Sequence, residues 1–443
     1  MIERRSNLLP AGLACLLALL LAALPAAAQE RAEEVFGQAA RYTVKIETNV
    51  PMPVYSEDEA GNFTGAGFVV EAERGWIVTN AHVVSRSPAK LRVRLRGGPW
   101  LPARRLYVDP YLDIAVLAPR EPAKLAGVEA ARLACDGMPP VGHPVGAFGH
   151  PWNLDFTGTR GIVAGASDRF EIGALLTDAP INDGNSGGPL ISLVDGRVVG
   201  VNTSALDAKS VQNLNFAIAS HYVCRILDLL RAGRDPSPLA RSLVLFADSR
   251  QTGEVKVARN FMPPGSIPLQ TGDVIEAVDG EPGPLTQESE LIHALRGHLD
   301  DVTLRIRRDG QSLTLRGRLP ATDPILQRRM IYASGVVFGQ ARGFDPSEIN
   351  YSRIATCHIE DGSLGNSAGF AGCDAVESVD GAVVDNLEDL YRRLDAARAA
   401  GRPVQVTVKR IAGLKGRSYF EYHELSLPVE ELQWLDLRDE KPQ

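Results

Sequence analysis

Asp183-Gly-Asn-Ser-Gly-Gly-Pro189 is the segment of this sequence that decides the fold. A nucleophilic serine needs backbone N–H groups beside it to bind the oxyanion that forms when it attacks a carbonyl carbon. Glycines on both sides of Ser186 allow a tight turn that aims two amides into one pocket. We expect the amides of Gly184 and Ser186 to form this oxyanion hole, with Asn185 in the same turn. The alternative is an ordinary glycine-rich turn.

A serine nucleophile also needs a base, and the base needs a carboxylate that orients it. His82 lies just after an apolar segment, and Asp113 opens the apolar run Asp113-Ile-Ala-Val-Leu117. Taken singly, these two residues read as a structural or solvated histidine and as a strand-end acid. The order His82, Asp113, Ser186 is that of chymotrypsin and differs from the orders in subtilisin and the α/β-hydrolases. We therefore predict a base, an orienting carboxylate and a nucleophile.

The region around these residues is rich in β-strand signals. Short β-rich segments separated by Gly, Pro, Asn and Asp fill residues 42–216, which indicates an antiparallel sandwich or barrel. Apolar residues then recur at helical spacing over Ser220–Arg231, so a helix is expected to close this unit. The stretch Ala232-Gly-Arg-Asp-Pro-Ser-Pro238 is typical of a linker.

An internal repeat follows the linker. Gly272-Asp-Val-Ile-Glu-Ala-Val-Asp-Gly280 matches Cys373-Asp-Ala-Val-Glu-Ser-Val-Asp-Gly381. In each copy a helical stretch comes next, and then a strand with a basic end: Leu285–Leu295 and Val302–Arg308 in the first, Leu387–Leu394 and Val404–Arg410 in the second. Two copies predict tandem domains, because a solenoid needs three or more units.

The N-terminus has the order of a secretory signal. Positive charge in Met1–Asn7, an apolar stretch over Leu8–Leu24 and the small residues of Pro25–Ala28 predict cleavage between Ala28 and Gln29. An uncleaved membrane anchor is the alternative.

Composition and cysteine usage narrow the remaining possibilities. The 443 residues suggest two to four domains, and a net charge of −7 argues against nucleic acid as the main partner. There is neither a zinc-type C-x2-C pair nor an H-E-x-x-H motif, so we expect no metal and no cofactor. After export four cysteines remain, Cys135, Cys224, Cys357 and Cys373. We favour pairing of the last two, which are close in sequence. Four buried thiols are the alternative.

Residues 35–231 resemble the trypsin-like proteases of the HtrA (high-temperature-requirement) type. The resemblance is carried by Gly65-Ala-Gly67, Thr79-Asn-Ala-His82, Asp113-Ile-Ala-Val-Leu117, Thr177-Asp-Ala-Pro-Ile-Asn182, Gly184-Asn-Ser-Gly-Gly-Pro-Leu190 and Asn215-Phe-Ala-Ile218. It implies a mostly β fold, in which a chymotrypsin-like double β-barrel holds the catalytic residues between its barrels and two PDZ-like α+β domains follow. The expected parts are a signal peptide (1–28), a protease domain (29–232), a first PDZ-like domain (240–320) and a second (330–430).

The same resemblance implies a function. It is that of an exported serine endopeptidase of the Gram-negative periplasm, which cleaves unfolded or damaged proteins in quality control and stress response. PDZ modules would capture substrates or regulate the enzyme. A catalytically inactive PDZ scaffold or holdase is the alternative. An esterase fits poorly, since no nucleophile elbow is present. The family commonly forms trimers through the protease domain and its N-terminal segment, where Phe36 and Tyr42 are either contacts or ordinary core residues.

Substrate preference follows from the position six residues before the nucleophile, which forms the floor of the specificity pocket in trypsin-like folds. Here it is Pro180, with Ile181 beside it, so the pocket has no carboxylate for Arg or Lys. Ile181 also fills space, which predicts cleavage after small aliphatic residues such as Val, Ala or Ile. Val201, Asn202 and Thr203 are expected to pair with the substrate backbone as an added strand, which requires an unfolded substrate.

PDZ domains bind a peptide C-terminus by β-augmentation, with the carboxylate on amides of a glycine-containing loop. In the second repeat this loop is expected at Ser334, Gly335, Val336 and Val337. The corresponding segment of the first repeat, Ser242–Phe246, lacks the glycine, so its grip on a carboxylate is doubtful. Docking or oligomer-contact modules without peptide binding are the alternative for one or both repeats.

Overall fold

The computed structural model describes residues 30–437 apart from 57, 110, 151–155, 168–173, 204–213, 241–242, 282, 341–353 and 415–416. The signal peptide expected at 1–28 therefore lies outside the described residues. None of the described helices is long and apolar enough to cross a membrane.

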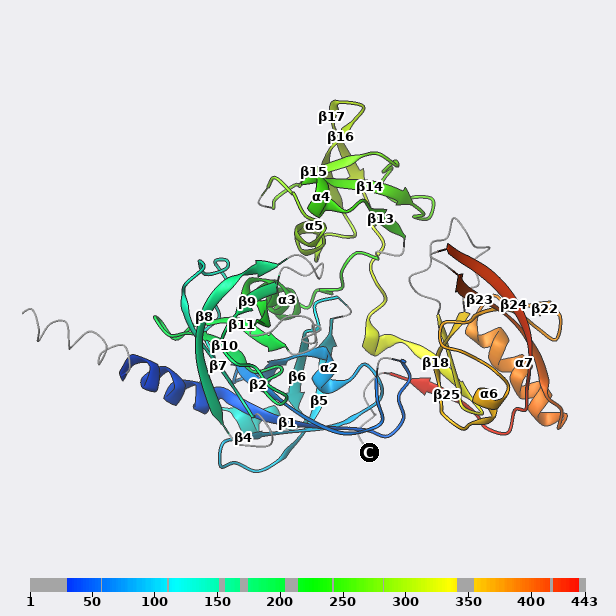
Figure 1. Cartoon of the computed structure of the whole chain (residues 1–443), viewed down its shortest axis with the longest axis horizontal. Coiled ribbons are helices and arrows are strands. Elements are labelled where there is room, and N and C mark those ends of the chain that lie inside the picture. The colour runs from blue at the N-terminus through cyan, green and yellow to red at the C-terminus, as the bar shows by residue number, and fades with distance from the viewer. Residues whose placement is uncertain are drawn as a thin grey trace, which may run out of the picture.

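Two closed antiparallel barrels form the first part of the described chain, at the lower left of Figure 1. The first has the order β1-β2-β3-β6-β5-β4 and the second the order β10-β11-β12-β9-β8-β7. The strands of the first are β1 (Thr43–Val50), β2 (Gly61–Glu71), β3 (Trp76–Thr79), β4 (Lys90–Leu95), β5 (Leu101–Val108) and β6 (Ala115–Pro119). Those of the second are β7 (Pro144–Gly149), β8 (Thr157–Ser167), β9 (Ala174–Thr177), β10 (Pro189–Ser192), β11 (Val198–Thr203) and β12 (Asn215–Ala219). The expected mostly β double barrel is confirmed.

Short helices complete the barrel unit. They are α2 (Ala81–Val84), η1 (Pro122–Leu125) and α3 (Ser220–Arg231), the last with the bounds that the sequence predicted. A further helix spans residues 30–42. Tyr42 at its end is only 3% exposed and belongs to the barrel core, which fits the core alternative and not an oligomer contact. Phe36 is partly buried and stacks on Phe148, with ring centroids 5.9 Å apart.

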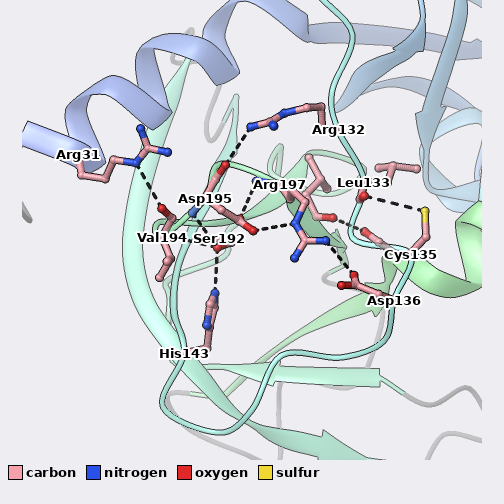
Figure 2. A network of polar contacts seen from close by, with 12 residues as sticks. Arg31, Arg132, Leu133, Cys135, Asp136, His143, Ser192, Val194, Asp195 and Arg197 are labelled. Carbon is pink, nitrogen blue, oxygen red and sulfur yellow. Dashed lines mark hydrogen bonds and ion pairs between the residues drawn. The ribbon is translucent and has the colours of Figure 1, made fainter.

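A polar network fastens this N-terminal helix to the second barrel (Figure 2). Its centre is the turn between β10 and β11. Arg31 donates to the carbonyl of Val194 at 3.3 Å, and Arg132 donates to the carbonyl of Asp195 at 3.0 Å. Arg197 binds the carboxylate of Asp195 at 2.7 Å. Because β10 follows the Ser186 loop, this network also fixes the strand that leads away from the predicted nucleophile.

The disulfide in the structure joins Cys135 to Cys224, with their Cα atoms 5.8 Å apart, while Cys357 and Cys373 are thiols outside this disulfide. The pairing favoured from the sequence is therefore wrong. The reason is the course of the chain beside β11. The amide of Ala134 and the hydroxyl of Ser220 both donate to the carbonyl of Val198, so the segments that carry the two bonded cysteines are neighbours.

The two repeats fold into two sheets with matching strand order. The first has the order β13-β14-β15-β16-β17, and the second contains β19-β20-β21-β23-β24. The elements of the first are β13 (Val244–Phe246), α4 (Ser249–Thr252), β14 (Val255–Asn260), β15 (Val274–Val278), α5 (Glu288–Leu295), β16 (Val302–Arg308) and β17 (Gln311–Gly317). Those of the second are β19 (Val336–Gln340), β20 (Ile354–Ile359), α6 (Leu364–Ser367), β21 (Ala375–Val379), β22 (Ala382–Val383), α7 (Leu387–Ala399), β23 (Val404–Leu414) and β24 (Arg417–Leu427).

The second repeat differs from the first by two added strands on one edge. After η3 (Ile325–Gln327), β18 (Arg329–Ala333) pairs with β19, and β25 (Leu432–Asp436) pairs with β18. The matching strand of the first repeat, β13, pairs with β14 alone among the described strands. The two repeats therefore present different edges: the second covers its own, and the first leaves β13 at the end of its sheet.

Candidate active site

The structure brings His82 and Asp113 into direct contact. His82 stands in α2, immediately after β3, and its backbone amide donates to Oδ1 of Asp113 at 2.9 Å. Its ring Nδ1 lies 2.7 Å from Oδ2 of the same carboxylate. The amide of Ala81 and the side chain of Asn80 both donate to the carbonyl of Asp113, at 3.1 and 3.0 Å. Four contacts thus hold the imidazole and the carboxylate in one orientation.

Asp113 has an unusual backbone conformation, with φ of +54°. This left-handed region costs free energy for a residue other than glycine and persists only where neighbouring groups enforce it. Asp109, at the end of β5, is completely buried and supplies that enforcement. Its Oδ1 accepts the amides of Tyr111 and Leu112, both at 2.7 Å, and its own amide donates to the carbonyl of Ile114 at 2.7 Å. The turn between β5 and β6 is therefore built around the Asp109 carboxylate.

Ser186 lies where the two barrels meet. It is 4% exposed, and its carbonyl accepts the amide of Ala66 from β2 of the first barrel at 2.9 Å. Gly65 in β2 lies in close contact with both α2 and the Ser186 loop. A Cβ on Gly65 would lie 2.6 Å from a methyl of Val83 in α2 and 3.2 Å from the Ser186 carbonyl oxygen. The helix that carries His82 and the loop that carries Ser186 thus meet at Gly65, which fits the expectation that both residues lie between the two barrels.

The glycines around Ser186 adopt backbone conformations that favour glycine. Gly184 and Gly187 have φ of +97° and +82°, and a Cβ on Gly187 would lie 2.1 Å from the Thr79 hydroxyl. The amide of Asn185 donates to the carbonyl of Asn182 at 2.9 Å, so it is committed within the loop. Asn185 thus contributes to the turn through its backbone. The amides of Gly184 and Ser186 stay the predicted pair.

The residues of the expected specificity pocket differ in exposure. Ile181 is 9% exposed, and Pro180 is exposed, with its carbonyl accepting the hydroxyl of Thr159 at 2.8 Å. The nearby carboxylate of Asp178 accepts the amide of Ile162 at 2.6 Å, which directs it toward β8. The role of Pro180 and Ile181 in substrate choice stays a prediction.

The segment expected to pair with substrate has little free backbone for that pairing. Val201 and Asn202 are completely buried in β11, an inner strand paired with both β10 and β12. The amide and carbonyl of Asn202 also bind Gly188 and Gly187, each at 2.9 Å. An inner strand has no open edge, so the prediction for Val201 and Asn202 is wrong. Thr203 instead contacts the predicted triad, because its hydroxyl donates to Oδ2 of Asp113 at 3.2 Å.

The segment after α2 is supported by the loop between β1 and β2. The carboxylate of Asp58 accepts the hydroxyl of Ser85 and the amide of Ser87, both at 2.8 Å. The same loop packs on the second repeat in a buried apolar cluster made of Val54, Tyr55, Met330, Tyr332, Val337, Leu435 and Leu437. The hydroxyl of Ser56 donates to the carbonyl of Cys357 at 2.9 Å. The second repeat therefore touches the loop that braces the His82 segment.

The expected carboxylate loop of the second repeat is a tight turn between β18 and β19. The Ser334 hydroxyl accepts the amides of Glu430 and Glu431, at 2.9 and 3.2 Å, and its amide donates to the carbonyl of Glu431 at 3.0 Å. Val336 and Val337 belong to β19, which pairs with β18 on one side and β20 on the other. A peptide cannot add to β19 in this arrangement, because the chain's own β18 occupies that edge.

No group of three His, Cys, Asp or Glu side chains that could hold a metal ion occurs among the described residues. The predicted residues would perform nucleophilic attack by Ser186, with His82 as a base oriented by Asp113 and with amides that bind the oxyanion.

Comparison with known proteins agrees with this geometry. The family described as a trypsin-like peptidase domain matches residues 65–201. A probable periplasmic serine protease of Haemophilus influenzae, do/HhoA-like, is 26% identical over 359 residues, which are 76% of this chain and 74% of that protein. The serine protease Do-like HtrA of Lactococcus lactis is 33% identical over 288 residues, or 56% of this chain and 69% of that protein.

A solved structure shares the fold. It is the HtrA-type protease AlgW with a decapeptide, with a TM-score of 0.51 and 22% identity, covering 66% of this chain and 99% of that one. Fold and sequence lead to the same conclusion: the chain belongs to the HtrA (Do-like) family of trypsin-like serine proteases and is a serine endopeptidase.

Proposed function

We propose that this endopeptidase is exported to the periplasm and there cleaves unfolded or damaged proteins, with Ser186 as nucleophile, His82 as general base and Asp113 as orienting carboxylate. The observation that carries the proposal is the pair of contacts from Asp113 to the amide and ring Nδ1 of His82. The signal-like N-terminus and the periplasmic name of the Haemophilus relative support the location.

In the proposed mechanism Asp113 fixes the ring of His82 through Nδ1, so Nε2 is the nitrogen that takes the proton of the Ser186 hydroxyl. The serine oxygen attacks the scissile carbonyl carbon, and the amides of Gly184 and Ser186 bind the oxyanion. His82 then returns the proton to the leaving amine, and water repeats the sequence on the acyl-enzyme. Asp113 stabilises the positively charged imidazole in both halves.

We also propose the predicted division of the chain, namely a signal peptide at 1–28, a protease domain at 29–232 and PDZ-like domains at 240–320 and 330–430. Of the two repeats, the first offers a sheet edge to which a peptide strand could add, because β13 ends its sheet while β18 covers β19 in the second. Its segment Ser242–Phe246 lacks the loop glycine, so the capture would rest on strand pairing more than on the terminal carboxylate. The docking role considered for the repeats suits the second, whose strands pack on the β1–β2 loop.

Digestion of denatured casein by the parent and by Ser186→Ala tests the proposed triad. Loss of the nucleophile should lower kcat by about 10⁴-fold or more, and His82→Ala combined with Ser186→Ala should cost no more than either change alone, because the residues act as one unit. A fluorophosphonate probe should label the parent only. Substantial peptidase activity in a clean Ser186→Ala preparation would show that the triad is misassigned, and an unlabelled, inactive parent would favour a scaffold.

A further inference from the structure

A buried ion pair joins the first repeat to the turn that carries Asp113. Arg296, which directly follows α5, is 1% exposed, and its Nη1 lies 2.7 Å from Oδ2 of Asp109, which is completely buried. The same nitrogen donates to the carbonyl of Pro236 at 2.6 Å and lies 3.3 Å from the hydroxyl of Tyr107. That hydroxyl donates to Oδ2 of Asp109 at 2.8 Å. The contact is thus a closed cluster with the carboxylate at its centre.

The two oxygens of Asp109 have different partners. Oδ1 accepts the amides of Tyr111 and Leu112 and so shapes the turn that places Asp113 at a positive φ. Oδ2 receives Arg296 and Tyr107. One carboxylate therefore connects a side chain of the first repeat directly to the backbone turn that presents Asp113.

Because Asp109 is buried, its negative charge depends on the groups that contact it. A carboxylate removed from water is stable as an anion only when a cation or several donors compensate its charge. Among the described residues, Arg296 is the cation paired with Asp109. Burial and the nearby Asp109 carboxylate also raise the pKa of Tyr107 well above its usual value, so its hydroxyl keeps the proton that it donates. Within the described chain, Nε and Nη2 of Arg296 have no hydrogen-bond partner, so the guanidinium is itself imperfectly satisfied.

We propose that Arg296 is a positioning residue of the protease. By compensating Asp109, the docked first repeat keeps the turn between β5 and β6 closed and keeps Asp113 bonded to His82. The proposal rests on the triad proposed above, and it adds that the active site is complete only while the first repeat is docked.

The test uses the full chain with Arg296→Met, which removes the charge and keeps much of the side-chain length. We expect kcat on a peptide substrate to fall about tenfold or more, because the unpaired carboxylate disturbs the Asp113 turn. KM should stay unchanged, since the expected pocket residues Pro180 and Ile181 belong to the second barrel. Labelling of Ser186 by a small fluorophosphonate should slow by the same factor, because it needs the triad but no specificity pocket.

A second variant separates positioning from mere folding. Asp109→Asn combined with Arg296→Met retains an Oδ1 that accepts the two amides but buries no unpaired charge. We expect its kcat to lie between those of the parent and Arg296→Met, with KM unchanged. If Arg296→Met alone does not fold, the double variant tests the positioning role in its place. A kcat equal to the parent's, in either folded variant, would overturn the proposal.

Glu281→Gln is the matched control. Glu281 binds Arg225 at 2.6 Å across the same contact between α3 and the first repeat, without reaching Asp109. Its kcat should match the parent's, and a loss equal to that of Arg296→Met would mean that docking in general matters and Arg296 does not. Asp113→Ala separates the failure of the proposed triad from the failure of the positioning role. If Asp113→Ala stays active, the triad is wrong. If Asp113→Ala is inactive and Arg296→Met has the kcat of the parent, only the positioning role of Arg296 fails.

Discussion

At the scale of single residues, the specificity pocket gives the sharpest expectation. Ile181→Ala should enlarge the space before the scissile bond, so that cleavage after Leu and Phe rises about tenfold relative to cleavage after Val. A methylene in such a pocket is worth only ~1–3 kcal/mol, so the change in preference should be graded. Mass-spectrometric mapping of the cuts in reduced casein measures it.

Ile162→Ala is the matched control for this measurement. Ile162 is 40% exposed on β8, so the same truncation there should leave the cleavage pattern unchanged. Cuts that mostly follow Arg or Lys, in the parent or in either variant, would mean that the floor of the pocket has been misidentified.

The residues that perform the proposed chemistry could be predicted because each has a local signature. Ser186 has flanking glycines, His82 follows an apolar strand, and their order along the chain with Asp113 is diagnostic. Asp109, Thr203 and Arg296 have no such signature. A buried aspartate and a buried arginine 187 positions apart (296 − 109) look like ordinary surface charges until the fold brings them together.

At the scale of elements, helices α3 and α5 meet through aromatic rings. Tyr222 lies at 4.6 Å and 88° to the ring of His293, and at 4.0 Å from that of His221. Burial lowers the pKa of His293 to about 3, with help from the charges of Arg296 and Arg225 and from His221. Burial also lowers the pKa of His221. The docked contact therefore favours the neutral form of both rings.

This contact should make the docking of the first repeat dependent on pH. Protons bind the separated helices better than the packed ones, because the folded pKa of His293 lies below the ordinary value of 6.5. The stability of the contact is complete above about pH 6.5 and declines as pH falls from there toward 3. One histidine contributes at most about 1.4 kcal/mol per pH unit. Urea unfolding followed between pH 7.5 and 5 measures this decline.

His293→Phe is the control for the pH experiment. It keeps a ring against Tyr222 and removes the titrating group, so its stability should vary less with pH than that of the parent. An equal slope in both proteins would place the titration elsewhere.

The strand order of the two repeats illustrates what a sequence pattern can convey about elements. The shared Asp-Gly segments predicted two similar sheets, which the structure contains. They could not show that β25 (Leu432–Asp436) pairs with β18 (Arg329–Ala333), because the two segments lie far apart in the sequence. The pairing of β18 with β19 is local, across the two-residue turn Ser334-Gly335, whereas the pairing of β25 with β18 is long-range, and no local signal in either segment specifies it.

At the scale of the whole molecule, the disulfide closes a loop of 89 residues that includes most of the second barrel. Replacing Cys135 and Cys224 by Ser should lower the free energy of unfolding by about 2–4 kcal/mol, because the unfolded chain regains that loop's freedom. Thermal melts with and without dithiothreitol check this: the reductant should lower the melting temperature of the parent and leave the double variant unchanged.

Cys373→Ser is the control for this change, since Cys373 is exposed and lies outside the disulfide. It should melt like the parent. A melting temperature of the Cys135→Ser, Cys224→Ser protein equal to the parent's would contradict the stabilising role. The correct pairing could not be predicted from the sequence. A disulfide requires Cα atoms within roughly 4.4–6.8 Å of each other, and the topology of the fold, not the separation along the chain, sets that distance.

The edge strands of the second repeat have a consequence for its solubility. A strand at the end of a sheet offers a row of unpaired N–H and C=O groups, which can template pairing with another molecule. β25 covers β18 along five residues, from Arg329 opposite Asp436 to Ala333 opposite Leu432. Trimming the chain before Leu432 would uncover that row on a strand whose Met330, Ile331 and Tyr332 are now buried. The shortened protein should therefore self-associate through intermolecular sheets, while its barrels remain folded.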